Sequence, residues 1–173
     1  IIDENFGIVK GVINTVHAYT NDQSLSDVPH KDWRRSRAAA ENIIPTSTGA
    51  ARVVGKVLPE LNGKLDGIAS RVPVPDGSVV DLFLELEKET TVNDVNQVIL
   101  DASKTIRMMN VLEYSSMPIV STDIIGNPNS SIYDAGCTKI VGGKFLRTLN
   151  WYDNEWGYSN RVVDLINLLE KKM

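Results

Sequence analysis

The chain has 173 residues, of which 42% are hydrophobic, and carries a formal net charge of −4 at pH 7. This length suffices for one well-packed domain, and the acidic balance argues against nucleic acid as a partner. No apolar run reaches the roughly 18 residues of a membrane-spanning helix, so no membrane association is expected.

The chain starts at Ile1 rather than Met, which favours a piece of a longer protein. The first predicted element is a strand over residues 7–20, rich in β-branched residues. His17 lies near the end of this strand, just before a polar loop, which is a common place for a proton-transferring group. On this pattern alone, a buried packing histidine is the commoner interpretation.

Residues 21–42 are predicted to form an unusually long loop. Its charged residues include a basic cluster, Lys31, Arg34, Arg35 and Arg37. A loop of this length in a compact domain is usually functional or disordered. It is either a solvated excursion or an arm that meets a ligand or a neighbouring subunit, and the apolar Val28 and Trp33 favour contact.

A helix is predicted to begin at Thr48-Gly49 and to end before Pro59. Its expected buried stripe consists of Ala50, Val53, Val54, Val57 and Leu58. Hydroxyl residues at a helix start cap free N–H groups, which is worth about 1 kcal/mol. The same N–H groups can also bind phosphate. Capping alone is the simpler interpretation.

Two strands are predicted over residues 65–74 and 78–87, joined by the turn sequence Pro75-Asp76-Gly77. Arg71 lies inside the first strand, and an arginine there requires an anion, either a carboxylate or a ligand phosphate. A structural ion pair is the commoner of these two alternatives.

A second helix is predicted to start at a capping box over residues 91–94, and a last helix follows residues 151–155. The expected apolar stripe of the last helix is Val162, Val163, Ile166 and Leu169. Short strands are predicted over residues 112–115, 130–134, 139–141 and 144–150. The pattern predicts an α+β fold in one domain, residues 1–173, with a mixed, mostly antiparallel sheet and about three helices on one face.

Two kinds of site are not expected in this chain. One cysteine and two histidines make a metal site improbable, and Cys137 is expected to be a packing residue in a reducing, cytoplasmic setting. No GxGxxG follows a strand, so no dinucleotide-binding unit is predicted.

Several segments in fixed order nevertheless resemble one family. They are NTVHAYTNDQ at 14–23, PHKD at 29–32, IIPTSTGA at 43–50, LPELNGKL at 58–65, SVVDL at 78–82 and WYDNEWGYSNRVVD at 151–164. Together they are similar to the C-terminal catalytic domain of phosphorylating glyceraldehyde-3-phosphate dehydrogenase, over essentially the whole chain.

The resemblance implies a glycolytic reaction that converts glyceraldehyde 3-phosphate and inorganic phosphate to 1,3-bisphosphoglycerate with NAD. His17 would activate a nucleophilic cysteine and accept a proton when hydride leaves for the cofactor. That cysteine belongs to a Ser-Cys-Thr-Thr-Asn motif that this chain lacks, as it lacks the N-terminal NAD-binding domain. This chain alone is therefore expected to be inactive.

The resemblance also assigns binding residues. Thr20 and Arg71 would hold the substrate phosphate, and Thr48, Gly49 and Arg35 the inorganic phosphate, with the neighbouring Arg34 an alternative to Arg35. The residues expected to contact NAD are Asn154, Tyr158 and Pro29. NAD is favoured over NADP, and the full-length protein is expected to be a homotetramer. The alternatives are an erythrose-4-phosphate dehydrogenase and a non-catalytic assembly or binding module of the same fold.

Overall fold

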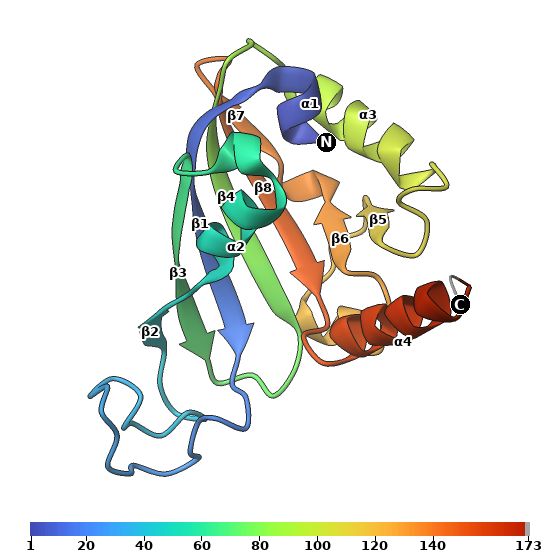
Figure 1. The fold of residues 1–173 in the computed structure, drawn as a ribbon. Coiled ribbons are helices and arrows are strands. Elements are labelled where there is room, and N and C mark those ends of the chain that lie inside the picture. The colour runs from blue at the N-terminus through green and yellow to red at the C-terminus, as the bar shows by residue number, and fades with distance from the viewer. Residues whose placement is uncertain (172–173) are drawn as a thin grey trace.

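The computed structural model describes residues 1–171 and shows one mixed sheet with helices packed against it (Figure 1). The strands are β1 (Ile8–Ala18), β2 (Ile44–Ser47), β3 (Leu65–Val72), β4 (Ser78–Leu86), β5 (Leu112–Ser115), β6 (Ser131–Asp134), β7 (Lys139–Val141) and β8 (Phe145–Tyr152). The α-helices are α1 (Ile2–Phe6), α2 (Ala50–Val57), α3 (Val92–Ser103) and α4 (Trp156–Glu170). The α+β prediction is confirmed.

The strand order is β2-β3-β1-β4-β8-β6-β5, with β7 paired to β8. The pairs β1–β3 and β5–β6 are parallel and the other pairs are antiparallel, as the prediction of a mixed, mostly antiparallel sheet required. Because parallel neighbours need a crossover, the chain leaves β1 through a long loop, β2 and α2 before it enters β3. The C-terminal ends of β1 and β3 consequently lie side by side.

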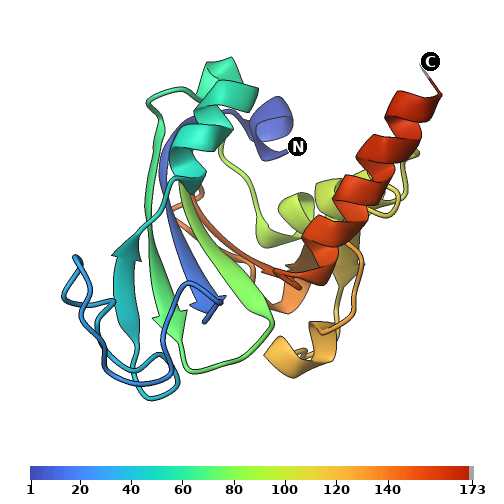
Figure 2. The same cartoon turned by 60° about the horizontal axis from the view of Figure 1, so that its bottom comes forward.

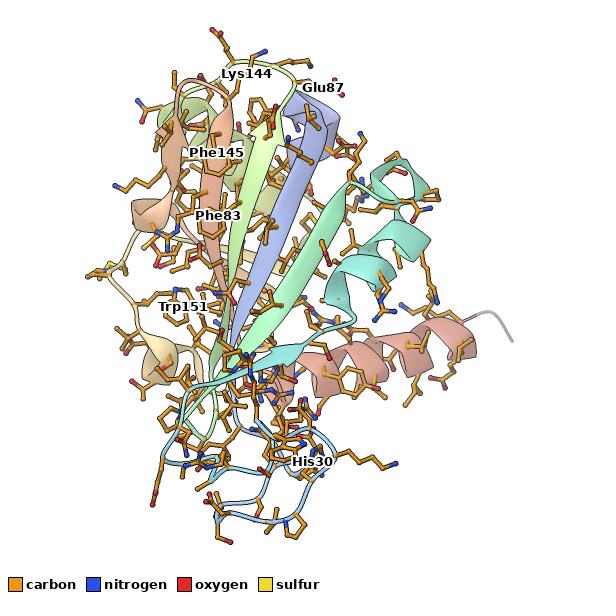
Figure 3. The ribbon with its side chains drawn as sticks, turned by 90° about the vertical axis from the view of Figure 1, so that its left-hand side faces the viewer. His30, Phe83, Glu87, Lys144, Phe145 and Trp151 are labelled. Atoms are coloured by element: carbon orange, nitrogen blue, oxygen red, sulfur yellow. The ribbon has the colours of Figure 1, made fainter. Side chains whose placement is uncertain are left out.

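The main hydrophobic core lies between the sheet and the helices. Its buried members are Phe6, Ile8, Leu61, Leu84, Leu86, Val95 and Leu146. The helices lie on one side of the strands in Figure 1, and Figure 2, in which the bottom of that view comes forward, shows the same arrangement. Figure 3 looks onto the opposite face, where the Phe83 and Phe145 rings stack at 6.4 Å.

Two elements were not predicted. The strand β2 breaks the sequence rules because Pro45 lies inside it, but β2 is an edge strand, where a missing N–H is tolerated. The one-turn helix α1 is too short to show a periodic pattern. By contrast, the capping box of α3 is present, with Asp94 N donating to Thr91 Oγ1 over 3.2 Å.

The predicted apolar stripes of two helices were wrong. Helix α2 buries the small residues Ala51 and Gly55 and leaves Val53 and Val57 exposed. The helix packs closely against the chain at Asn62 through Gly55, so the valines face outward. Helix α4 buries only Gly157, and its predicted stripe is exposed. None of the described helices is both long and apolar enough to cross a membrane.

Residues 19–43 form the predicted long loop, which extends beyond the end of β1 at the bottom of Figure 1. Backbone hydrogen bonds fold it onto itself, with Val28 N donating to Ser36 O and Ala39 N donating to Ser24 O. This loop leads from the end of β1 to β2, so its side chains are placed around the end of the sheet that carries His17.

Candidate active site

His17 and Arg71 lie directly beside each other because the parallel register of β1 and β3 pairs these two residues. Both side chains bond to one carbonyl group. The His17 Nδ1 lies 2.7 Å from Ala18 O, and Arg71 Nη1 donates to the same oxygen over 3.0 Å. A carbonyl only accepts, so Nδ1 carries the proton and Nε2 is left with a free lone pair.

The imidazole is biased toward its neutral form. Burial lowers the pKa of His17, and the positive charge of Arg71 lowers it further, while the bond to Ala18 and the charges of Asp22 and Glu155 act the other way. The ring also packs edge-on against Tyr152, with centroids 6.0 Å apart. A neutral ring with a free Nε2 is the form that accepts a proton.

An anion-binding pair stands next to this imidazole. Arg71 Nη1 donates to Thr20 Oγ1 over 2.9 Å, so the hydroxyl and the guanidinium predicted to share a substrate phosphate are in contact. The Arg71 Nε atom is buried and has no hydrogen-bond partner among the described residues. The guanidinium therefore retains unused donors at the same place where Thr20 offers a hydroxyl.

Asp22 belongs to this site, although the sequence had not indicated it. Its carboxylate accepts from Thr20 Oγ1 and, over 2.8 Å, from Arg35 Nη1. The Thr20 hydrogen bond, together with the charges of Arg35 and Arg71, holds the pKa of Asp22 below its usual value. The signal for it was an acidic residue two positions after Thr20, in a loop that also carries arginines.

Arg35, rather than Arg34, points toward the site. Its Nε donates to Thr46 Oγ1 over 3.0 Å, in addition to the bond with Asp22, whereas Arg34 is exposed. Arg35 thereby ties the long loop to the edge strand β2. Of the two neighbouring arginines, Arg35 is therefore the one that contacts residues of this group.

Thr48 and Gly49 stand at the start of α2, at some distance from this group. The β2–β3 register pairs Ile44 with Arg71 and Ser47 with Ile68, so Ser47, just before Thr48, lies about 10 Å from Arg71 along the strand. Thr48 Oγ1 accepts from the N–H of Ala50, the first residue of α2, over 3.2 Å. Thr48 and Gly49 therefore lie apart from Thr20 and Arg71, and Arg35 lies between the two sets through its bonds to Asp22 and Thr46.

Asn154 is fixed by a buried serine. Its Oδ1 accepts from Ser78 Oγ over 2.8 Å, and the same Ser78 oxygen accepts from Ala18 N over 3.1 Å. The Asn154 Nδ2 atom is buried without a partner among residues 1–171. An amide donor is therefore held ready close to the end of β1.

The remaining predicted residues lie outside this group. Tyr158 is 73% exposed on α4, where it lines a small pocket together with Asn154 and Arg161. Pro29 is exposed in the long loop, next to His30, which Figure 3 labels beyond the end of the strands. The structure gathers His17, Thr20, Arg71, Arg35 and Asn154; Tyr158 adjoins this group only through Asn154, and Pro29, Thr48 and Gly49 lie apart from it.

Cys137 is also separate from the site, as the sequence predicted. It lies in a 3₁₀ turn beside Asp134 and Arg147, near the start of β8, whereas Tyr152, which contacts His17, is the last residue of that strand. Burial and the neighbouring Asp134 raise the pKa of its thiol, which disfavours the nucleophilic thiolate. Within residues 1–171, no three His, Cys, Asp or Glu side chains are grouped as a metal would require.

Comparison with known proteins gives a consistent result. The family model "Glyceraldehyde 3-phosphate dehydrogenase, C-terminal domain" matches residues 1–154. The chain is 54% identical over 173 residues to glyceraldehyde-3-phosphate dehydrogenase of Mycobacterium leprae, covering 100% of this chain and 50% of the relative. It is 58% identical over 165 residues to the enzyme of the same name from Streptomyces coelicolor, covering 95% and 49%.

This chain spans about half the length of the curated relatives it matches. The matched residues, 1–154, include His17, Thr20, Arg35, Arg71 and Asn154. The chain belongs to the family of glyceraldehyde 3-phosphate dehydrogenase C-terminal domains.

Proposed function

We propose that this chain is the catalytic half of a phosphorylating, NAD-dependent enzyme that converts glyceraldehyde 3-phosphate and inorganic phosphate to 1,3-bisphosphoglycerate. The observation that carries this proposal is the contact of Arg71 with Thr20 directly beside His17. A phosphate-binding pair beside a proton acceptor is what the oxidation of a phosphorylated aldehyde needs, and this contact supports that assignment.

His17 supplies the base. With Nδ1 bonded to Ala18 O, its Nε2 can take the proton of a substrate hydroxyl while the ring orientation stays fixed. A positioned general base of this kind contributes about 10²–10⁴-fold to the rate. Before that step, an imidazolium formed by taking the proton of the cysteine thiol would stabilise the thiolate by its charge, and it would return this proton to the substrate oxygen when the thiolate attacks.

The phosphate groups are held by side chains from three segments. Arg71 would bind the phosphate of the substrate through charge-assisted hydrogen bonds. Thr20 would donate to the same phosphate once its hydroxyl proton, which goes to Asp22 in this structure, turns toward it. Arg35 and the first turn of α2, at Thr48 and Gly49, receive inorganic phosphate through a guanidinium and free backbone N–H groups.

Asn154 fits a nicotinamide carboxamide. Its buried Nδ2 is a donor without a partner among the described residues, and the carbonyl oxygen of the carboxamide is the matching acceptor. Asn154 would thus hold and orient the nicotinamide ring, with Tyr158 and Pro29 as further cofactor contacts. NAD, when bound, accepts the hydride.

The thiol nucleophile and the NAD-binding domain come, in this proposal, from the rest of a full-length homotetramer in the cytoplasm. Residues 1–173 by themselves are expected to be inactive, because Cys137 lies away from His17 and has a raised thiol pKa. An erythrose-4-phosphate dehydrogenase or a non-catalytic assembly module would keep the same fold. The unused donors of Arg71 and Asn154 favour a ligand-binding site over the module.

The test uses Arg71→Ala in the full-length protein, with Arg107→Ala as the control, because Arg107 is an exposed arginine that pairs with Glu4 away from the site. We expect Arg71→Ala to raise KM for glyceraldehyde 3-phosphate by at least about tenfold while leaving KM for unphosphorylated glyceraldehyde nearly unchanged. Arg107→Ala should change neither value. Equal effects of Arg71→Ala on both substrates would remove Arg71 from the phosphate site.

Steady-state comparison of glyceraldehyde 3-phosphate with erythrose 4-phosphate separates the two enzymatic alternatives. A higher kcat/KM for the tetrose would favour the erythrose-4-phosphate dehydrogenase. A full-length protein that oxidises neither aldehyde would favour the assembly module.

A further inference from the structure

Ser78 is a fully buried hydroxyl at the meeting point of three strands. It is the first residue of β4, pairs in register with Tyr152 at the end of β8, and is 1% exposed. The last paired residues of β1 and β4 are Val16 and Val79. Beyond that pair, the Ser78 side chain takes over and accepts the N–H of Ala18 over 3.1 Å.

The Ser78 hydroxyl forms hydrogen bonds with Ala18 and Asn154, two residues of the site. A serine hydroxyl has one proton to donate and two lone pairs to accept with. One lone pair receives Ala18 N, and the proton goes to Asn154 Oδ1 over 2.8 Å. Tyr152, the register partner of Ser78, packs edge-on against His17.

This arrangement determines which way the Asn154 amide faces. Because Ser78 occupies Oδ1, the Nδ2 group is turned away from Ser78 and remains without a partner among the described residues. Without the hydroxyl, the amide loses the contact that distinguishes its oxygen from its nitrogen and can rotate by half a turn. An acceptor would then stand where a donor is needed.

Ser78 also reaches the base through Ala18. The N–H of Ala18 is held by Ser78, and its carbonyl receives both His17 Nδ1 and Arg71 Nη1. One peptide segment is therefore fixed on one side by the serine and on the other by the imidazole and the guanidinium. A shift of this segment would move the base and the amide relative to each other.

We propose that Ser78 is a positioning residue that sets the orientation of the Asn154 amide, and thereby the placement of the nicotinamide carboxamide relative to His17. This inference rests on the proposed function, since it assumes that Asn154 receives NAD. It assigns Ser78 no chemical step of its own.

The experiment is a double-mutant cycle in the full-length protein with Ser78→Ala, Asn154→Ala and the double variant. The control is Ser115→Ala, another buried serine, whose Oγ accepts Met117 N over 3.2 Å in β5. NAD affinity is measured by calorimetry, and thermal melting checks that each variant folds. We expect Ser78→Ala to weaken NAD binding about tenfold, but less than about twofold when Asn154 is already alanine. Ser115→Ala should leave NAD affinity unchanged.

Two results would overturn the proposal. One is an unchanged NAD affinity in a folded Ser78→Ala protein. The other is the same loss of affinity with and without the Asn154 side chain, which would show that Ser78 does not act through the amide. If Ser78→Ala does not fold, Ser78→Cys, which keeps the volume but donates weakly, replaces it in the cycle.

Failure of the proposed function itself has a different signature. In that case the unsubstituted full-length protein would bind no NAD and oxidise no glyceraldehyde 3-phosphate, and every variant would match it.

Discussion

The environment at the end of β1 keeps the imidazole of His17 neutral and able to accept a proton. Burial against Tyr152 and the adjacent Arg71 lower its pKa, and the Ala18 carbonyl fixes which nitrogen carries the proton. A lone histidine on an apolar strand gave no such indication in the sequence. The neighbour that indicates a functional histidine is Arg71, which lies on β3, far from His17 in the sequence.

His17→Asn in the full-length protein should slow the first turnover by about 10²–10⁴-fold, because asparagine can still bond to Ala18 O but cannot accept a proton at neutral pH. Rapid-mixing measurement of NADH formation reports this step. His30→Asn in the exposed loop serves as the control and should leave the rate unchanged. An undiminished rate in His17→Asn would exclude a role as base.

The same environment predicts how the protonation of His17 and its contribution to stability depend on pH. Because the pKa of His17 is lowered in the folded state, the unfolded chain binds more protons between the folded value and 6.5. The stability that His17 contributes is thus present above pH 6.5 and is lost as pH falls toward the folded value. NMR of the His17 ring protons should show a midpoint below 6.5, and Arg71→Gln should raise it. A midpoint at or above 6.5 would contradict the burial argument.

At the scale of elements, the turn between β3 and β4 is held against a distant loop. Gly77 has φ of +86°, and a Cβ there would lie 2.4 Å from the Ser121 carbonyl oxygen. This close approach sets where β4 begins, and so where Ser78 lies. It connects the turn to the segment that precedes β6.

Gly77→Ala should destabilise the protein by about 1–3 kcal/mol more than Gly63→Ala, because a Cβ at Gly77 also clashes with backbone. Gly63 is the matched control: its φ is +79°, but nothing lies within 4 Å of its Cβ position, so alanine there incurs backbone strain alone. Urea unfolding of both variants gives the difference directly. Equal decreases in the free energy of unfolding would show that the backbone around Ser121 moves to accommodate the Cβ without an energetic penalty.

Asp153 joins β8 to α4. Its Oδ1 accepts from Glu155 N over 2.9 Å and from Trp156 N over 2.6 Å, and its Oδ2 accepts from Gly126 N over 2.8 Å. This buried carboxylate binds two N–H groups at the start of the helix and positions the next residue, Asn154. A helix after residues 151–155 was predicted from the sequence, whereas the bond to Gly126 was not.

Asp153→Ala should lower the free energy of unfolding by at least about 1–2 kcal/mol, the usual value of a lost N-cap, since a buried N–H loses its acceptor as well. Asp164→Ala removes an exposed ion pair with Arg161 and should cost less than about 1 kcal/mol. Both are measured by chemical denaturation. A smaller loss in Asp153→Ala than in the control would refute the capping role.

For the whole molecule, local patterns predicted most elements, and long-range pairing explains what they missed. Alternation and turn residues identified β4 and the turn at Gly77, and capping residues identified α3. The parallel pairing of β1 with β3, which brings Arg71 to His17, leaves no local mark because its partners are far apart in sequence. Ser78 was missed for the same reason, because its role exists only through contacts with Ala18 and Asn154, which are far away in the sequence. Asp22 was missed although its partners Thr20 and Arg35 lie in the same loop.

The wrong helix stripes have a related cause. Periodicity shows that a helix has an apolar side but not which side meets the sheet. Helix α2 approaches through Ala51 and Gly55, where small side chains allow close contact. Helix α4 leaves its apolar residues exposed, although the same spacing would suit a buried helix.

The long loop between β1 and β2 has one more consequence, concerning local unfolding. It supplies Asp22 and Arg35, and most of its hydrogen bonds are formed within the loop itself, whereas the Arg35–Thr46 and Arg71–Thr20 bonds join it to the sheet. Segments of this kind open at a small fraction of the global free energy. Amide protons of residues 24–39 should therefore exchange with deuterium long before those of β1 and β4. The loop that carries Asp22 and Arg35 can then open while the sheet that carries His17 and Arg71 stays folded.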